Sequence, residues 1–322
     1  MNDKSKQYKE LAIVFTLLAA ILIISYFILK EVSYPYASIA LLVVGGILAI
    51  AAVICWILFG VKLKKSKVEQ TAEQQAAREF TKWLENFDHL TKTAAELIPL
   101  DGDKKGFSKF GGLPVVPTEF TWPTENGKPI PFLLQLDFSE INPNGRLENF
   151  PVSGLLYFFV EEVATEDDLE YIKKLVFYEN ANALECAKAP HDLQTKYKEI
   201  FVAPNLIKTY PDTDDCDEAL DLCCARPCGG MDVRYNSRCW EKQDRHLVGG
   251  WPSHVQNGGF MKDCRESDDD NWVLLLQIKS EYSYGDDGDF VWGDDGILYV
   301  YIREQDLIAR NFDNVKLDMQ CT

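Results

Sequence analysis

The amino-acid sequence predicts an α+β fold: a mainly antiparallel, β-rich domain built from two pseudo-repeats and preceded by a two-helix transmembrane hairpin. Two long uncharged stretches, residues 11–29 and 37–61, predict the hairpin. From Gly106 onward, short apolar runs alternate with Gly and Pro, which is typical of strands and turns. Two similar segments, at about residues 106–160 and 246–302, predict the duplication.

We assign residues 1–67 to the hairpin. At a rise of about 1.5 Å per residue, the span 11–29 nearly matches a hydrocarbon core of about 30 Å, and the span 37–61 can cross with some tilt. A cleaved signal peptide is the alternative for the first span. It requires a shorter apolar region and a small-residue cleavage site, which residues 25–30 do not offer.

Lysines predict the orientation of the hairpin. They flank both outer ends, whereas the connecting loop holds only Lys30 beside Glu31. The flanking lysines are Lys4, Lys6, Lys9, Lys62, Lys64, Lys65 and Lys67. The positive-inside rule therefore predicts a two-span protein of the inner (cytoplasmic) membrane, with the N-terminus and the soluble domain in the cytoplasm. Gly45 and Ala49 predict a small-residue face on which the two helices, or two copies of the protein, pack closely.

Residues 68–98 are expected to form an amphipathic connecting helix that ends at Pro99. Its apolar stripe has helical spacing and consists of Phe80, Trp83, Leu84, Phe87 and Leu90. The polar face is mixed in charge rather than basic, so we expect the stripe to pack on the following domain rather than on lipid.

The domain then spans residues 99–322. Gln135 and Gly154 are separated by the same 19 positions as Gln277 and Gly296 (154 − 135 and 296 − 277), and a double glycine precedes each pair. Each glutamine lies in an apolar run that predicts a strand buried on both faces. Because a buried amide without partners costs about 1–3 kcal/mol, we expect both glutamines to bond a neighbouring loop, such as the double-glycine turn. The alternative is a pair of ligand-binding amides.

Less regular sequence separates the two similar segments. We expect a helix over residues 166–174, a strand over 175–178, and a final strand after a short helix or turn at 306–307 and 311–315.

The charge is distributed unevenly. The whole chain carries −17 and residues 1–67 carry +5, so residues 68–322 carry −22. This acidity repels phosphate backbones and excludes nucleic acid as an expected partner, and it favours a protein or peptide partner. A merely solubilising surface is the alternative.

A cysteine-rich segment raises the question of a metal. The thiols of Cys223, Cys224, Cys228 and Cys239 could hold a structural zinc ion, with His246 or His254 completing the site. The segment lacks paired Cys-x-x-Cys units, and unligated thiols are the favoured alternative. The predicted cytoplasmic location argues against stable disulfides.

Two acidic turns, residues 285–288 and 293–296, could bind calcium or magnesium through their carboxylates. Asp-Gly is also a common hairpin turn, which favours a structural role. The sequence contains no phosphate-binding loop, nucleophile elbow or paired-histidine helix, and with four histidines in total we nominate no catalytic base.

Several motifs occur in a characteristic order, and the chain from about residue 75 to 322 resembles the bacterial YwqG-like domain of unknown function. The motifs are Phe110-Gly-Gly-Leu-Pro, Phe120-Thr-Trp-Pro, Phe132-Leu-Leu-Gln-Leu-Asp, Gly154-Leu-Leu-Tyr-Phe, Val248-Gly-Gly-Trp-Pro, Leu274-Leu-Leu-Gln-Ile and Trp292-Gly-Asp-Asp-Gly-Ile-Leu-Tyr. The resemblance implies an α+β domain with mainly antiparallel strands and carries no reaction or cofactor. The membrane hairpin and the cysteine-rich segment depart from it.

These observations lead to two hypotheses. The first is a membrane-anchored cytoplasmic module that binds a protein or peptide partner in a regulatory or immunity-like role. The second is a small-ligand-binding protein or enzyme with a pocket between the two similar segments. Its expected lining residues are Trp122, Gln135, Asp137, Gln277, Trp292, Asp294 and Asp295.

Overall fold

The computed structural model describes residues 3–31, 35–100, 106–164, 169–181, 183–224, 235–237, 239, 245–267, 270–281 and 289–321. The chain divides into two compact units, Met1–Trp83 and Leu84–Thr322. The first unit consists of two long helices, and the second is a large, nearly closed antiparallel β-sheet domain with short helices.

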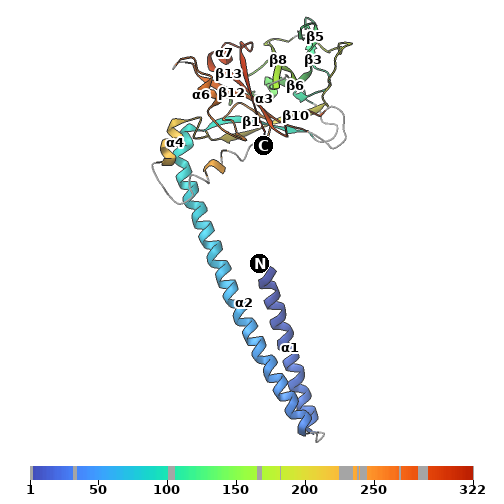
Figure 1. Ribbon diagram of the computed structural model, residues 1–322, viewed down its shortest axis with the longest axis vertical. Helices are drawn as coiled ribbons and strands as arrows, with labels where there is room; N and C mark the ends of the chain where they lie inside the picture. The colour runs from blue at the N-terminus through green and yellow to red at the C-terminus, as the bar shows by residue number, and fades with distance from the viewer. Residues whose placement is uncertain are drawn as a thin grey trace. The chain divides into compact units, whose positions relative to one another are not determined.

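The two helices of the first unit, α1 (Asp3–Glu31) and α2 (Pro35–Leu84), run antiparallel and side by side (Figure 1). Both are long and apolar enough to cross a membrane, judged by length and composition. A Cβ added at Gly45 would lie 3.7 Å from the Cβ of Leu22, so the helices approach closely there. Small residues fill the contact, namely Ala12, Ala19, Gly45 and Ala52, all of which are buried.

The predicted packing face is half correct. Gly45 is buried, but Ala49 is exposed and Ala52 takes its place. Seven residues span about two turns at 3.6 residues per turn, so Gly45 and Ala52 share one side of α2.

The predicted connecting helix over residues 68–98 is wrong in its second part. α2 continues unbroken to Leu84 and is followed by a 3-10 helix, η1 (Glu85–Leu90), and by the strand β1 (Lys92–Pro99). β1 pairs with a strand on each side, and this pairing overrides the helical pattern of its sequence. Phe87 does pack on the domain, where its ring centroid lies 4.3 Å from that of Tyr235.

The main sheet of the second unit has ten strands in the order β14-β13-β12-β11-β1-β10-β2-β6-β7-β8. Besides β1, its strands are β2 (Lys109–Phe110), β6 (Phe132–Asp137), β7 (Leu155–Ala164), β8 (Leu169–Tyr178), β10 (Ile200–Thr209), β11 (Leu247–Val248), β12 (Trp272–Lys279), β13 (Ile297–Arg303) and β14 (Val315–Gln320). Every pair of neighbours is antiparallel. The predicted antiparallel class and the predicted final strand are confirmed.

Smaller elements surround this sheet. Two ribbons pair β3 (Val115–Pro117) with β9 (Leu184–Cys186) and β4 (Thr124–Glu125) with β5 (Lys128–Pro129). The short helices are α3 (Phe138–Ile141), α4 (Asp217–Cys224), α6 (Phe260–Asp263) and α7 (Glu304–Ile308).

The helix expected over residues 166–174 is wrong, because the described part of this segment belongs to β8. Alternate side chains of β8 join two different apolar clusters: Leu175 and Phe177 join the main core, whereas Val176 and Tyr178 pack on a second cluster. A period of two places residues on opposite faces of a strand, and the acidic start of the segment obscures that period in the sequence.

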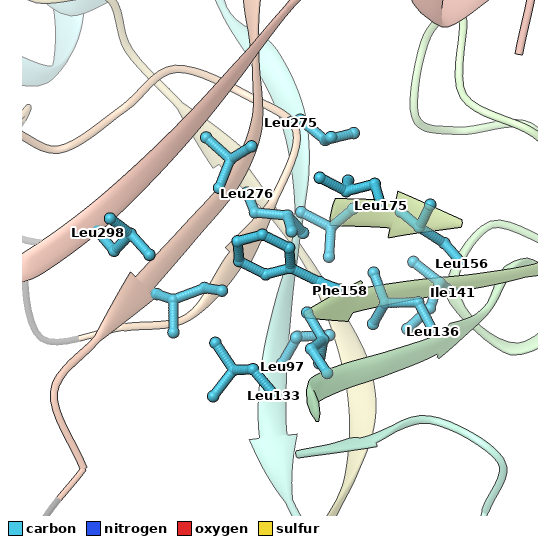
Figure 2. Close-up of a cluster of buried hydrophobic side chains, with 14 of the residues drawn as sticks. Leu97, Leu133, Leu136, Ile141, Leu156, Phe158, Leu175, Leu275, Leu276 and Leu298 are labelled. Carbon is cyan, nitrogen blue, oxygen red and sulfur yellow. The ribbon is translucent and has the colours of Figure 1, made fainter. Parts of the chain in front are cut away.

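The sheet curls so that its outer strand β8 meets the segment before β14. The ring centroids of Phe177 and Phe312 lie 5.1 Å apart, and Lys174 Nζ lies 2.6 Å from Asp313 Oδ1. The edge of β8 is thereby shielded from pairing with another chain. Figure 2 shows the core enclosed by this curvature, where Leu97, Leu133, Leu136, Ile141, Leu156, Phe158, Leu175, Leu275, Leu276 and Leu298 converge.

Gln135 binds the chain on both sides of the first double-glycine turn. Its Oε1 accepts a hydrogen bond from Val115 N at 2.8 Å, and its Nε2 donates to Phe107 O at 2.7 Å. Gly111 N donates to Leu133 O at 2.8 Å.

Gln277 repeats this arrangement at the second double-glycine turn. Its Oε1 accepts from Ser253 N at 2.9 Å, and its Nε2 donates to Arg245 O at 3.1 Å. Gly249 N donates to Leu275 O at 3.1 Å. Both amides lie fully buried, so the predicted structural role of the two glutamines is confirmed.

The strand that precedes each double-glycine motif in the sequence pairs with the strand at the other motif, not with the one at its own. β1 pairs with β11 through Ala95 and Val248, whereas β10 pairs with β2 through Ile200 and Phe110. β1 and β10 also pair with each other at the centre of the sheet. Ala95 therefore pairs with the residue before the second double glycine, and Ile200 pairs with the residue before the first.

Candidate functional site

A pocket of about 160 Å³ opens in the second unit where segments distant in sequence meet. Its walls come from Thr91 and β1, the loop after α3, the second double-glycine turn, β12 and α7. The lining residues are Thr91, Lys92, Thr93, Arg146, Glu148, Asn149, Phe150, Gly250, Val273, Leu274, Glu304 and Leu307.

The loop after α3 is held by Asn142, which is itself buried. Asn142 Oδ1 accepts from Leu147 N at 2.8 Å, and Asn142 Nδ2 donates to Pro151 O at 3.1 Å. The loop closes against the second double-glycine turn, where a Cβ added at Gly249 would lie only 2.9 Å from Phe150 Cε2. Only a glycine allows this approach, so the turn and the loop together form one wall of the pocket.

The Glu304 carboxylate is fixed at the start of α7. Asn149 Nδ2 donates to its Oε1 and Asn271 Nδ2 donates to its Oε2, each at 2.8 Å. Asn149 has a φ of 65°, and its carbonyl accepts a hydrogen bond from Arg310 Nη1 at 2.6 Å. Since a carboxylate offers about four lone-pair positions, Glu304 can accept further bonds from a ligand.

Lys92 is the partly buried cation of the pocket. Its Nζ lies 4.0 Å from the centroid of the Trp251 ring, and Trp251 Nε1 donates to Leu90 O at 2.7 Å, which holds the ring in place. Burial lowers the pKa of Lys92 below its ordinary value, and the carboxylates of Glu304 and Glu148 oppose that shift only in part.

Neither Lys92 nor Arg146 forms an ion pair within the described residues. Arg146 is exposed at the rim, as is Glu148. The pocket therefore presents two cations and two carboxylates beside the hydroxyls of Thr91 and Thr93. Such a mixture can bind a small polar molecule of mixed charge.

The residues nominated from the sequence lie elsewhere: none of the seven is among the described residues that line this pocket. Trp122 packs against Phe159, and its Nε1 donates to Ile130 O at 2.9 Å. Asp137 caps α3 by accepting from Ser139 N at 2.8 Å. Gln135 and Gln277 are bonded to the backbone. Ligand binding by the nominated residues stays a prediction.

The remaining nominees belong to the turn before β13. Trp292 is buried beside Phe290, with ring centroids 5.9 Å apart. Asp294 and Asp295 are exposed in a turn closed by the bond from Gly296 N to Trp292 O at 2.7 Å. The companion acidic turn, residues 285–288, lies outside the described residues.

The predicted zinc ligands are only partly described. Cys223 and Cys224 lie on α4, Cys228 falls outside the described residues, and Cys239 is buried with its Sγ 3.2 Å from Pro211 O. Burial raises the pKa of the Cys239 thiol. Where the chain is described, no group of three or more His, Cys, Asp or Glu side chains could hold a metal ion. Zinc at this segment remains a prediction.

The two histidines considered as zinc ligands each face a carboxylate. His254 Nε2 lies 2.7 Å from Asp215 Oδ2, and both side chains are buried. Burial lowers the pKa of His254, but the Asp215 hydrogen bond and charge outweigh it, so the net direction is upward. His246 Nε2 lies 3.1 Å from Glu281 Oε1. This hydrogen bond is the main cause that lowers the pKa of Glu281 to about 2, while burial lowers the pKa of His246.

Sequence reasoning missed the pocket residues because no local motif marks them. Lys92 and Glu304 are 212 positions apart (304 − 92) and meet only through the strand order of the sheet. One signal was available. Phe150 of the first similar segment and Gly250 of the second both line the pocket, whereas Lys92 and Glu304 lie outside the two segments.

Comparison with protein-family models gives a match. The model of a protein family described as "Domain of unknown function (DUF1963)" matches residues 108–321, which is more than half of the chain. No curated protein matches the sequence.

Proposed function

The chain belongs to the DUF1963 family of domains of unknown function, and we propose that it is a membrane-anchored module that binds a partner at the cytoplasmic face of the inner membrane. The observation that carries this proposal is the surface of α1 and α2. Large apolar side chains such as Leu17, Ile24 and Ile47 are each about 60% exposed. Transfer of such a side chain from water to an apolar environment is favourable by about 1.5–3 kcal/mol, and a bilayer provides that environment.

The lysines support a cytoplasmic orientation for both outer ends. Lys62 Nζ lies 5.0 Å from the centroid of the Tyr8 ring, so the basic end of α2 adjoins the start of α1. An aromatic ring beside lysines is typical of the membrane–water interface. By the positive-inside rule, we expect this interface to be the one on the cytoplasmic side of the membrane.

The anchor predicts that the full-length protein stays in the membrane fraction after alkaline carbonate extraction. Leu17→Arg is expected to reduce this retention, since an arginine at the centre of a span costs about 2.5–3.5 kcal/mol. Gln75→Arg, on the polar part of α2, is the matched control and should be retained like the unmodified chain. Release of the unmodified protein by carbonate would contradict the anchor.

We propose that the partner is a protein or peptide with basic character, in a regulatory or immunity-like role. The support is the charge of −22 over residues 68–322. Chemical cross-linking of the full-length protein in native membranes is expected to capture a specific partner. Because salt screens exposed charges, the complex should weaken as ionic strength rises. Recovery of no partner beyond those captured by an unrelated two-span protein would count against this role.

The proposal includes a gene duplication and a YwqG-like assignment within the family. The paired contacts of Gln135 and Gln277, and the crossed pairing of β1 with β11 and of β10 with β2, support the duplication. The assignment rests on the ordered motifs of the sequence.

A second candidate function is the binding of a small molecule, and the pocket at Lys92 and Glu304 favours it. It is compatible with the anchor, because a tethered domain can respond to a soluble ligand. No catalytic step is proposed.

A further inference from the structure

The two halves of the sheet offer two corresponding positions for a pocket. Since Ala95 corresponds to Ile200, Lys92 corresponds to Tyr197. In the same way, the hydrogen bonds of Tyr157 OH to Val115 O and of Tyr299 OH to Ser253 O, both 2.7 Å, are equivalent.

Glu162 follows Tyr157 by the same five positions as Glu304 follows Tyr299, so these two glutamates also correspond. The pair Lys92 and Glu304 in one half thus matches the pair Tyr197 and Glu162 in the other. Glu162 lies close enough to Tyr197 to affect its pKa: burial, with help from Glu161 and Glu162, raises the pKa of Tyr197 to about 12.

Aromatic rings fill the position around Tyr197. The ring of Tyr197 meets that of Phe290 edge-on with centroids 5.8 Å apart, and Phe290 packs on Trp292 at 5.9 Å. Trp292 meets Tyr171 at 6.2 Å, and Tyr171 OH donates to Glu162 Oε2 at 2.7 Å. Glu162, like Glu304, is therefore bonded to the domain, and the two positions differ in the rings that pack around Tyr197.

The position around Lys92 is open by contrast. The same scaffold is packed with rings in one half and holds a pocket of about 160 Å³ with charged walls in the other. The fold can therefore accommodate aromatic rings at such a position, as it does around Tyr197. It does not itself require the open pocket at Lys92. Lys92 is partly buried and has no ion-pair partner among the described residues, which costs free energy that a ligand carboxylate would recover.

We propose that this pocket binds a small zwitterion, a free α-amino acid or a dipeptide, with its carboxylate at Lys92 and Arg146 and its ammonium at Glu304. The inference deepens the second candidate function and rests on it. A simple anion would meet the carboxylates of Glu148 and Glu304, and a simple cation would meet Lys92 and Arg146, so each would be partly repelled. The volume is below the roughly 300–1,000 Å³ of pockets for larger organic ligands, which limits the ligand to a small molecule.

Isothermal titration calorimetry of the full-length protein in nanodiscs tests the proposal. The titrants are the twenty α-amino acids and a panel of dipeptides, with propionate and ethylamine as controls that each carry one of the two charges. At least one zwitterion should bind ten-fold or more tightly than both controls. Binding should weaken as pH rises through the lowered pKa of Lys92, because the neutral amine no longer attracts the carboxylate.

Variants distinguish this pocket from other surfaces. Glu304→Gln and Lys92→Met are each expected to weaken binding ten-fold or more, whereas Glu162→Gln, at the filled position, should leave it unchanged. Arg146→Ala provides a further test that does not depend on the core, because Arg146 is exposed. It should weaken binding with an unchanged melting temperature.

Three results would overturn the proposal: no binding by any amino acid or dipeptide, binding of propionate as tight as that of the best zwitterion, or full affinity in both Glu304→Gln and Arg146→Ala. Carbonate extraction and cross-linking of the same preparation keep the outcomes separate. A protein that remains in the membrane and captures its partner, yet binds no zwitterion, loses only this inference.

Discussion

Asp215→Ala is expected to lower the free energy of unfolding by about 3–5 kcal/mol, the cost of removing one partner of a buried ion pair. Asp215 and His254 both have almost no exposed surface, and Asp215 Oδ1 also accepts a hydrogen bond from Gly259 N at 2.8 Å. The alanine variant would leave the imidazole without its charge partner and the Gly259 amide without its acceptor. Urea denaturation of the full-length protein, followed by tryptophan fluorescence, measures the loss.

The matched control is Asp214→Ala. Asp214 is the exposed neighbour of Asp215, and changes at exposed positions usually alter stability by less than about 0.5 kcal/mol. Equal losses in the two variants would show that the buried pair contributes nothing special to the domain.

The same pair predicts a pH dependence. The pKa of His254 is raised in the folded protein, so the folded state holds this proton more tightly than the unfolded chain does. The contribution is fully present below the ordinary histidine value of 6.5 and is lost as pH rises through the raised pKa. The unmodified protein should therefore lose part of its stability over that window, and Asp215→Ala should not. An identical pH profile for both proteins would contradict the assignment.

Gly111→Ala is expected to cost about 2–5 kcal/mol, which combines the penalty of a left-handed backbone with that of overpacking. Gly111 has a φ of 54°, and an added Cβ would lie closer than contact distance to the backbone carbonyl of Lys198. A carbonyl of the main chain cannot move aside as a side chain can. Thermal unfolding should show the loss as a lower melting temperature.

Gly127→Ala separates the two contributions. Gly127 also has a positive φ, 79°, but no atom lies within 4 Å of the added Cβ. Its cost should be limited to the backbone term of about 1–2 kcal/mol. A loss as large as that of Gly111→Ala would show that the crowding at Lys198 has no energetic effect.

The parts of the fold that could be predicted from the sequence are those with a local signal. The antiparallel class, the two long apolar helices and the bonding role of Gln135 and Gln277 all follow from periodicity, length or the cost of burying an amide. Residues 92–98 and 166–174 were predicted wrongly, since their local patterns suit a helix and only pairing in the sheet makes the described residues strands.

The residues of the candidate site could not be predicted from local sequence patterns. The sequence predicts a ligand pocket between the two similar segments, which stays a prediction; the pocket in the structure is lined by residues of both segments and by Lys92 and Glu304 outside them. Residues that stand out in the sequence have structural contacts instead: Trp292 is buried in the core, and Gln277 is hydrogen-bonded to the backbone. Lys92 and Glu304 look ordinary in the sequence, because a charge in a pocket and a charge on an open surface have the same local pattern.

The crossed pairing of the central strands bears on how the chain matures during synthesis. Ala95 of β1 pairs with Val248, 153 positions later (248 − 95). The pairing of β1 with β11 therefore cannot form until Val248 has been synthesised. At about 5–20 residues per second, this interval lasts roughly 8–30 s. Neither half can complete its share of the sheet alone, so the nascent domain should acquire protease resistance in one late step after residue 248 has left the ribosome.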